Sequence, residues 1–377
     1  MNFFEDMSMA SFPRLKPGVQ HFNTEYGTFA GFSHRGIEIT SLLAPQILRM
    51  LDGSRSLQSI CKGMADGSSG LEDTQEFVSE VSQILSALHS ANLIEFRSSA
   101  LHSYQDGDFA AVNLVNTTNR MRAEENLYSW HEKVGLKKSA EELICERLNF
   151  AIIIFGQNRL ALSLFSILQA SGFSRTRLID RSINQAQATT SQISPDQVCG
   201  MAIRGSDVGQ RKELVIADLA RNSRLLHEAE LSFPIKPDFI ISTENMAQDT
   251  LQRWMSEAIP HLSISNLMES KITLGPIVLP GISPCLNCLS LWRSEQFPLH
   301  KEFELLAGLE NRLEMPAGQV ALLSGLIAIN VIEFCATLQS KLIGLTQTID
   351  LLDPTLSEKL ENRYWQPHMD CGCQQLI

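Results

Sequence analysis

Two closely spaced pairs of cysteines constrain the fold of this 377-residue chain more than any other feature of its sequence. Cys285 and Cys288 form a C-x-x-C motif, and Cys371 and Cys373 form a C-x-C motif. Two such pairs can supply four thiolates to one tetrahedral zinc ion. Because the pairs lie far apart in the sequence, a single site requires a tertiary fold that brings them together. We therefore expect a structural zinc clip, in which the sulfur ligands leave no position for water.

A redox role for the C-x-x-C motif is the main alternative to a zinc site. A redox pair usually opens a helix after a strand, whereas Gly281 and Pro284 precede this motif and are more typical of a knuckle. His368 could replace one cysteine as a ligand, but four cysteines suffice, so we expect a solvated histidine. The other cysteines lie within or beside apolar runs and are expected to be core thiols: Cys61, Cys145, Cys199 and Cys335.

The composition is that of a globular, acidic protein. Hydrophobic residues make up 44% of the chain and the net charge is −11, which argues against a nucleic-acid partner held through its phosphates. Residues Val320–Leu338 are apolar enough to cross a membrane, but Asn330 and Glu333 would be costly there, so a buried helix is predicted. The N-terminal residues lack the pattern of a signal peptide. We expect a cytoplasmic protein with reduced cysteines and no membrane partner.

The first 97 residues are predicted to form one domain. Strands are predicted over Gly18–Phe22, Thr28–Phe32 and Gly36–Thr40, and a last strand over Leu93–Phe96. Between them, apolar residues recur at helical spacing in three segments. Three strands followed by three helices are typical of a winged helix-turn-helix domain. Residues 98–145 are more polar and are expected to form a partly helical linker.

Residues 146–377 have the pattern of an α/β domain. Phe150–Phe155 is a continuous apolar run, which is typical of a strand buried on both faces. An amphipathic helix is predicted over Leu160–Ala170, with Gly172 after its end. The remaining predicted strands are Arg177–Ile179, Leu214–Ala217 and Phe239–Ser242. Strands that alternate with helices indicate a doubly wound, mostly parallel sheet.

The sequence predicts a degenerate nucleotide site in this domain. Such a fold binds a nucleotide through G-x-G-x-x-G after the first strand, because the backbone must approach phosphate closely. Only Gly156 remains here, and Asn158 and Ala161 replace the other glycines. Asp180 could bind a ribose and Asp218 could hold magnesium at the ends of strands. The alternatives are a solvated carboxylate for the first and a helix N-cap for the second. We do not expect ATP as a cofactor.

The stretch around the C-x-x-C motif resembles a known family. Gly275–Gly281, Pro284–Leu289 and Trp292-Arg293 are similar to the pattern G-P-L-V-x-P-G, C-x-x-C-L and R of the ocin-ThiF-like partner proteins of azole-forming peptide pathways. Chains of that family end near H-P-x-C-G-C. Residues 368–373 of this chain read H-M-D-C-G-C, so that the cysteines match and a methionine replaces the proline.

The N-terminal domain resembles a PqqD-like precursor-recognition domain through Gly36–Thr40, Ile47–Gly53 and Ser56-Leu57. Such a domain binds a leader peptide by strand addition beside its third strand and against its third helix. The resemblance therefore implies a peptide site on those two elements, with these residues: Ile37, Glu38, Ile39, Thr40, Phe77 and Val81.

Together the two resemblances imply a leader-binding scaffold with a ThiF-like fold. It would present a ribosomal precursor peptide to a YcaO partner, which performs the ATP-dependent azoline formation, and it is compatible with a homodimer. A ThiF-type enzyme that adenylates a peptide carboxylate is the alternative, and the degenerate glycine loop argues against it. A winged-helix DNA regulator is a third hypothesis. It is disfavoured because the predicted third helix has no Lys or Arg between Glu72 and His89.

Overall fold

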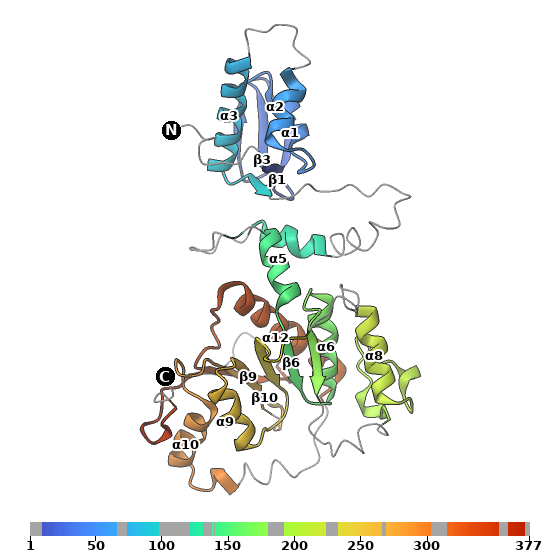
Figure 1. Ribbon diagram of the computed structural model, residues 1–377, viewed down its shortest axis with the longest axis vertical. Coiled ribbons are helices and arrows are strands. Elements are labelled where there is room, and N and C mark those ends of the chain that lie inside the picture. The colour runs from blue at the N-terminus through green and yellow to red at the C-terminus, as the bar shows by residue number, and fades with distance from the viewer. Residues whose placement is uncertain are drawn as a thin grey trace. The chain divides into compact units, whose positions relative to one another are not determined.

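The structure is a computed structural model that describes residues 10–65, 74–97, 121–130, 138, 140–179, 192–223, 233–265, 269–302, 315–353 and 361–373 (Figure 1). The chain divides into two compact units, Met1–Ile144 and Cys145–Ile377. Each unit has its own cluster of buried hydrophobic side chains. Each is therefore a structural unit in its own right.

Short strands and helices build the N-terminal unit. Strands β2, β3 and β4 form an antiparallel sheet in that order, and β1 pairs antiparallel with β5. The elements are β1 (Phe12–Leu15), β2 (Gln20–Asn23), β3 (Thr28–Phe32), β4 (Arg35–Ile39), α1 (Ala44–Met50), α2 (Leu57–Ala65), α3 (Thr74–Ser90) and β5 (Ile94–Arg97). Each predicted strand and helix has its counterpart. The sequence does not predict β1, because its four residues include a proline and its partner strand is distant in the chain.

Part of the expected linker belongs to the N-terminal unit. Within residues 121–130, most of which are helical, Glu125 is buried and its carboxylate pairs with Arg97 and lies 3.8 Å from the Arg14 guanidinium. These arginines lie on β5 and β1. Burial lowers the pKa of Arg14, and the charge of Glu95 opposes that shift. The domain boundary predicted at residue 97 therefore lies too early, because a polar segment can be anchored by buried charges that hydrophobic periodicity does not reveal.

The C-terminal unit is built on a seven-stranded sheet with the order β12-β11-β10-β9-β8-β6-β7. Strands β9, β8, β6 and β7 are parallel to one another, whereas β10 pairs antiparallel with β9 and is followed by the antiparallel strands β11 and β12. The strands are β6 (Ile152–Phe155), β7 (Thr176–Ile179), β8 (Phe239–Ser242), β9 (His261–Ile264), β10 (Lys271–Val278), β11 (Leu345–Asp350) and β12 (Glu361–Tyr364). The helices are α5 (Ala140–Asn149), which crosses the unit boundary, α6 (Arg159–Ala170), α8 (Lys212–Ser223), α9 (Gln248–Ser256), α10 (Leu286–Gln296) and α12 (Ala317–Thr337).

Side chains of β6 alternate between two hydrophobic layers. Ile152 and Ile154 are completely buried in the main core, which includes residues of α6 and α12. On the other face of the strand, Ile153 and Phe155 pack with Trp254 of α9, and the rings of Phe155 and Trp254 are 5.2 Å apart. The apolar run predicted to be buried on both faces is thereby confirmed.

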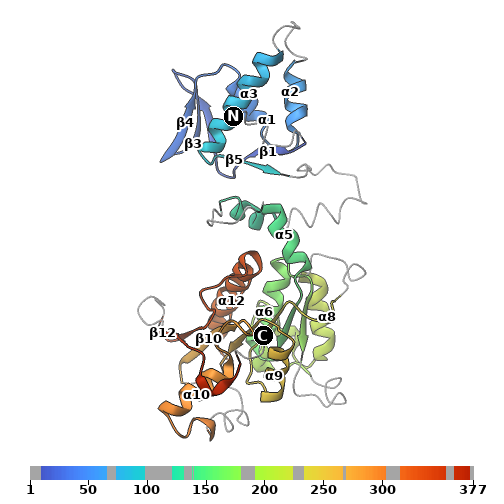
Figure 2. The same cartoon turned by 60° about the vertical axis from the view of Figure 1, so that its left-hand side comes forward.

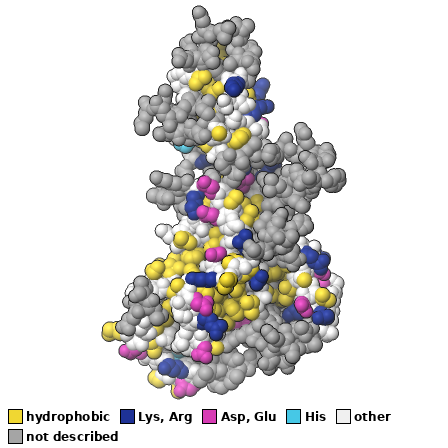
Figure 3. Space-filling model, in the orientation of Figure 1, with side chains coloured by type: hydrophobic (Ala, Val, Ile, Leu, Met, Phe, Trp, Pro, Cys, Tyr) yellow, Lys and Arg dark blue, Asp and Glu magenta, His cyan; other side chains and the backbone are white. Residues whose placement is uncertain are grey.

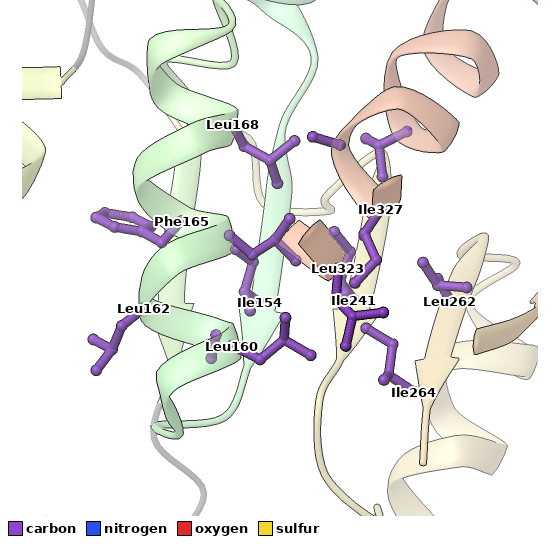
Figure 4. Close-up of a cluster of buried hydrophobic side chains, with 14 of the residues drawn as sticks. Ile154, Leu160, Leu162, Phe165, Leu168, Ile241, Leu262, Ile264, Leu323 and Ile327 are labelled. Atoms are coloured by element: carbon purple, nitrogen blue, oxygen red, sulfur yellow. The ribbon is translucent and has the colours of Figure 1, made fainter. Parts of the chain in front are cut away.

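Helices α6 and α12 pack against each other over the parallel half of the sheet. Figure 4 shows Leu160 and Leu168 of α6 on the side that faces Leu323 and Ile327 of α12. The side chains of Leu162 and Phe165 point to the opposite side of α6. The helix is therefore buried on more than one face, and its buried residues include the polar Ser163 and Gln169, which the prediction of an amphipathic helix did not anticipate.

Helix α12 is the buried helix predicted from the apolar run Val320–Leu338. Its length and composition would allow it to cross a membrane, with a mean hydropathy of 2.0, yet half of that window is buried inside the unit. Its ring of Phe334 lies 4.9 Å from that of Phe239 on β8. Hydrophobic side chains also reach the surface of this unit, where Figure 3 shows them among interspersed acidic and basic side chains. The core therefore accounts for the buried half of α12, whereas Leu322 and Ile329 are exposed.

The prediction of a strand over Leu214–Ala217 is wrong, because these residues lie within helix α8. The run is short and apolar, so its pattern does not distinguish a strand from a helix. Within α8 only Val215 and Ala220 are buried apolar residues, and Leu214 is 55% exposed. The four residues are distributed around a surface helix and do not form an interior strand.

Replacement of Glu125 by alanine should destabilise the N-terminal unit by about 3–5 kcal/mol, the usual cost of removing one partner from buried charges. Arg97 and Arg14 would then lose the carboxylate that they share. Hydrogen exchange of the β1 and β5 amides in the full chain measures this loss. Glu25→Ala, at an exposed position of the same unit, is the matched control. Equal protection in both variants would show that the segment does not anchor this unit.

Candidate functional site

Helix α10 places the first cysteine pair. Strand β10 ends at Val278, and a turn leads to Cys285, which is the N-cap of α10. Cys288 lies in the first turn of this helix, and both thiols are buried. The positive end of the helix dipole favours thiolates at these positions. The C-x-x-C motif does open a helix after a strand, so its place in the fold does not by itself distinguish a zinc knuckle from a redox pair.

The second pair lies on a short turn near the C-terminal end of the sequence. Cys371 ends the 3-10 helix η4 (Met369–Cys371), and Cys373 follows it after Gly372. Gly372 has a φ of +64°, in the left-handed region, where a side chain is disfavoured. This turn lets two cysteines separated by one residue approach the same point.

The four sulfur atoms form one compact cluster. The Sγ atoms of Cys285 and Cys288 are 3.8 Å apart, and those of Cys285–Cys371 and Cys288–Cys373 are each 3.4 Å apart. All four lie within 4.8 Å of one another. A tetrahedral ion with Zn–S bonds of about 2.3 Å places its sulfurs about 3.8 Å apart. The geometry can therefore hold a metal ion and is consistent with zinc.

Two of the four thiols, Cys285 and Cys373, are difficult to ionise. Burial raises the pKa of Cys285, and it raises the pKa of Cys373 to about 11. Burial would also raise the pKa of Cys371, but hydrogen bonds from Asn287 and the neighbouring thiols lower it below its usual value. The amide Nδ2 of Asn287 donates to the Sγ of Cys371 at 3.2 Å. A divalent cation would supply the positive charge that several neighbouring thiolates require.

His368 helps to hold the tail against α10 and is not a member of the sulfur cluster. Its Nδ1 accepts a hydrogen bond from the backbone N–H of Asp370, and its Nε2 lies 3.0 Å from Glu295. Its ring packs edge-on against Trp292 at 4.7 Å. The expectation of a solvated histidine is wrong, because His368 is only 8% exposed. The contacts that bury it lie on α10, far away in the sequence.

The predicted nucleotide loop connects β6 to α6. Gly156 has a φ of +137°, and a Cβ there would lie 2.1 Å from the Thr243 hydroxyl. Asn158 caps α6, because its Oδ1 accepts the N–H of Ala161 at 2.8 Å. Asn158, which replaces a glycine of the pattern, therefore serves the helix itself. Asp180 lies outside the described residues.

Asp218 does not end a strand, and it does not cap a helix. It lies inside α8, where it forms an exposed ion pair with Arg221. Its proposed roles as a magnesium ligand or an N-cap are therefore wrong, since both depended on the strand misassigned to Leu214–Ala217.

Sequence reasoning missed the residues that surround the β6–α6 loop. Glu244 follows β8 and is buried, and its Oε1 accepts the backbone N–H of Gln157 at 3.1 Å. The buried Lys212 donates to the Gln157 side chain at 2.6 Å, and Gln197 donates to the Gln157 carbonyl at 2.9 Å. The position of Glu244 at the carboxyl end of a parallel strand was the available signal, because such ends meet at one edge of the sheet.

The predicted peptide site lies on β4 and α3 of the N-terminal unit. Strand β4 pairs only with β3 in its sheet, so its other side is an edge among the described residues (Figure 2). Glu38 and Thr40 are exposed, Ile37 is half-buried, and Ile39 is 8% exposed. An edge with these alternating side chains can accept an added strand.

The α3 part of the predicted peptide site needs one correction. Val81 is completely buried in the core of the unit, so it does not line an open groove. Val78, one turn earlier, is only partly buried. The side chain of Phe77 lies outside the described residues. Apolar spacing on a helix does not separate the residues of the core from those of a groove wall.

No protein-family model and no curated protein sequence matches this chain. Solved structures do match it, and they are consistent with a ThiF-like fold. MccB of E. coli in complex with MccA-N7isoASN has a TM-score of 0.56 at 14% identity, over 96% of this chain and 99% of that one. MccB with ATP has a TM-score of 0.54 at 14% identity, over 97% and 99%. PaaA has a TM-score of 0.57 at 14% identity, over 92% and 97%. At this identity the likeness shows the fold alone.

Purified chain should contain one zinc ion, and a serine at any of the four clustered cysteines should lower both zinc content and melting temperature. Metal binding also stabilises the fold, because the unfolded chain does not hold the ligands together. Elemental analysis and thermal unfolding measure the two effects. Cys145→Ser is the control, since Cys145 is exposed and not the core thiol that the sequence predicts. Metal-free protein of unchanged stability would exclude the zinc site.

Proposed function

We propose that this chain binds a ribosomally made precursor peptide and serves in the maturation of that peptide. The fold likeness to MccB carries the proposal, because the Microcin C7 biosynthetic enzyme MccB was solved with N-formylated MccA. Another MccB structure holds MccA-N7isoASN. The likeness extends over 96% of this chain and so includes both units.

The edge of β4 is the proposed peptide-binding element. An extended peptide can add to it through main-chain hydrogen bonds, while neighbouring side chains provide specificity. The ring of Phe29 packs over Gly36, where a Cβ would lie 2.3 Å from that ring. This contact fixes the hairpin of β3 and β4 and keeps the edge in place before a peptide arrives. A preformed edge lowers the entropic cost of binding.

Proline substitutions along β4 test the edge. Successive residues of a strand direct their N–H groups alternately to the paired strand and to the free edge. We therefore test three variants: Ile37→Pro, Glu38→Pro and Ile39→Pro. A proline at a residue whose N–H points to β3 should destabilise the unit. A proline at a residue whose N–H points to the free edge should weaken peptide binding and preserve folding. Fluorescence polarisation with the short peptide encoded beside the gene measures affinity, and circular dichroism measures folding. Glu38→Ala is the control that retains the N–H. Unchanged affinity in every folded proline variant would contradict this site.

Two activities of a peptide-binding ThiF-like protein remain candidates. The comparisons favour the ATP-dependent adenylating enzyme, because MccB was also solved with ATP and with AMPCPP plus MccA. The scaffold that presents a peptide to a YcaO partner rests on the resemblance of residues 275–293 and 368–373. The β6–α6 loop supports the scaffold, since its polar groups are hydrogen-bonded within the chain. We propose the scaffold role on that geometry, with the adenylating enzyme as the second candidate.

The isolated wild-type chain should not catalyse ATP–pyrophosphate exchange, with or without peptide. The N–H of Gln157 and the N–H of Ala161 already have acceptors in Glu244 and Asn158, and a phosphate would have to displace them. Exchange of radiolabelled pyrophosphate into ATP is the measurement. Peptide-stimulated exchange would reject the scaffold role and establish the adenylating enzyme, whereas peptide binding would still stand.

A further inference from the structure

We propose that the edge of β4 selects its peptide by charge as well as by main-chain hydrogen bonds. The preferred segment is extended and carries an acidic and a basic residue three positions apart, with an apolar residue next to the basic one. This inference rests on the proposed peptide-binding function and names the class of peptide. Three residues of β4 carry it: Arg35, Ile37 and Glu38.

Arg35 is oriented at the start of the edge, where it is the first residue of β4. Its guanidinium carbon lies 5.6 Å from the ring centre of Phe32 and 5.5 Å from that of Trp130. The indole N–H of Trp130 donates to the carbonyl of Pro17 at 3.2 Å, which fixes that ring. Aromatic faces attract a cation without neutralising its charge. Arg35 stays exposed, and no described residue supplies a carboxylate partner for it.

Glu38 places the opposite charge three residues further along the edge. It is exposed, and its carboxylate accepts a hydrogen bond from the Thr24 hydroxyl. Glu80 of α3 lies near the same end of β4, because its carboxylate accepts a hydrogen bond from the Ser41 hydroxyl. Within the described part of the chain, no Lys or Arg pairs with Glu38. The edge is therefore cationic where β4 begins and anionic where it ends.

Strand geometry converts this polarity into a spacing. Residues directly opposite each other on neighbouring strands share a face, with Cβ atoms about 5 Å apart. In an added strand, the side chains opposite Arg35 and Glu38 are therefore three residues apart, about 10 Å along the strand. Complementary charges at these two positions would fix the register of the peptide and exclude wrong partners.

The apolar position of the peptide lies opposite Ile37. Ile37 pairs with the fully buried Ala30 of β3, so it is on the face of the sheet that covers the core. Ile37 and Val78 of α3 both pack against that core and are only partly buried. A side chain opposite Ile37 gains apolar contact on this face. Because Ile37 precedes Glu38, the apolar residue of the peptide is adjacent to its basic residue.

Selection from a phage library of random ten-residue peptides against the full chain tests this inference. We expect the enriched peptides to share an acidic and a basic residue three positions apart, with the apolar residue next to the basic one. The same library selected against the double variant Arg35→Glu, Glu38→Arg should give the exchanged pattern. The apolar residue should then lie next to the acidic one, because the charges of the edge are reversed.

Fluorescence polarisation with one enriched peptide, labelled with fluorescein, measures the charge contact directly. Arg35→Glu should weaken binding about tenfold, because an attraction becomes a repulsion. A lysine in place of the acidic residue of the peptide should restore most of this loss. Glu38→Ala should weaken binding only about two- to threefold, which is less than the loss from a proline that removes an edge N–H. Arg55→Glu is the matched control, since Arg55 is exposed in the same unit and lies outside β4.

Circular dichroism identifies the folded variants. Enriched peptides without the charge pattern, or equal affinity of wild type and Arg35→Glu, would overturn the inference and leave peptide binding at the edge intact. A loss in Arg35→Glu that the lysine peptide does not restore would also overturn it, because a charge pair predicts rescue. If no peptide were enriched, the proposed peptide-binding function would fail as well.

Discussion

The return of the chain's C-terminal segment onto α10 is the interaction on which the antiparallel half of the C-terminal unit depends. Four sulfur atoms from two distant segments meet within 4.8 Å. Around them, the indole N–H of Trp292 donates to the carbonyl of Gln366, and Trp292 and Glu295 enclose His368. These contacts fix the end of β12 beside β11. A metal clip has the largest effect where it closes a long loop, because more chain entropy is removed.

In the same unit, the loop between β6 and α6 lies at the carboxyl end of the parallel strands. Its polar groups find hydrogen-bond partners within the chain. Gln157 is bonded through its N–H, its carbonyl and its side chain to three different segments. A loop in this position of the fold normally keeps its N–H groups for a ligand. Internal partners make the loop stable without a nucleotide.

The sequence predicted elements well where a hydrophobic pattern was long. The run Phe150–Phe155, the helix α6 and the helix α12 were placed within a few residues. The two uninterrupted apolar runs are separated by their length, since the short run that ends before Gly156 suits a strand and the long run Val320–Leu338 suits a helix. Short or polar segments were less certain. Leu214–Ala217 became a helix, and β1 was not anticipated. The buried charges around Glu125 were also missed, because a charged residue gives no pattern that reveals its burial.

The sequence by itself determined the chemistry of the sulfur site, because two close cysteine pairs can be read without any structure. It also determined that the glycine loop was altered. Only the tertiary structure decided which groups from other segments contact the altered loop. Glu244, Lys212 and Gln197 approach that loop from separate segments, and nothing in their local sequence indicates the meeting. Likewise, only folding decided that Val81 is interior and that β4 is an edge. Spacing along a chain fixes which residues share a face, whereas their neighbours depend on how strands pair and helices pack.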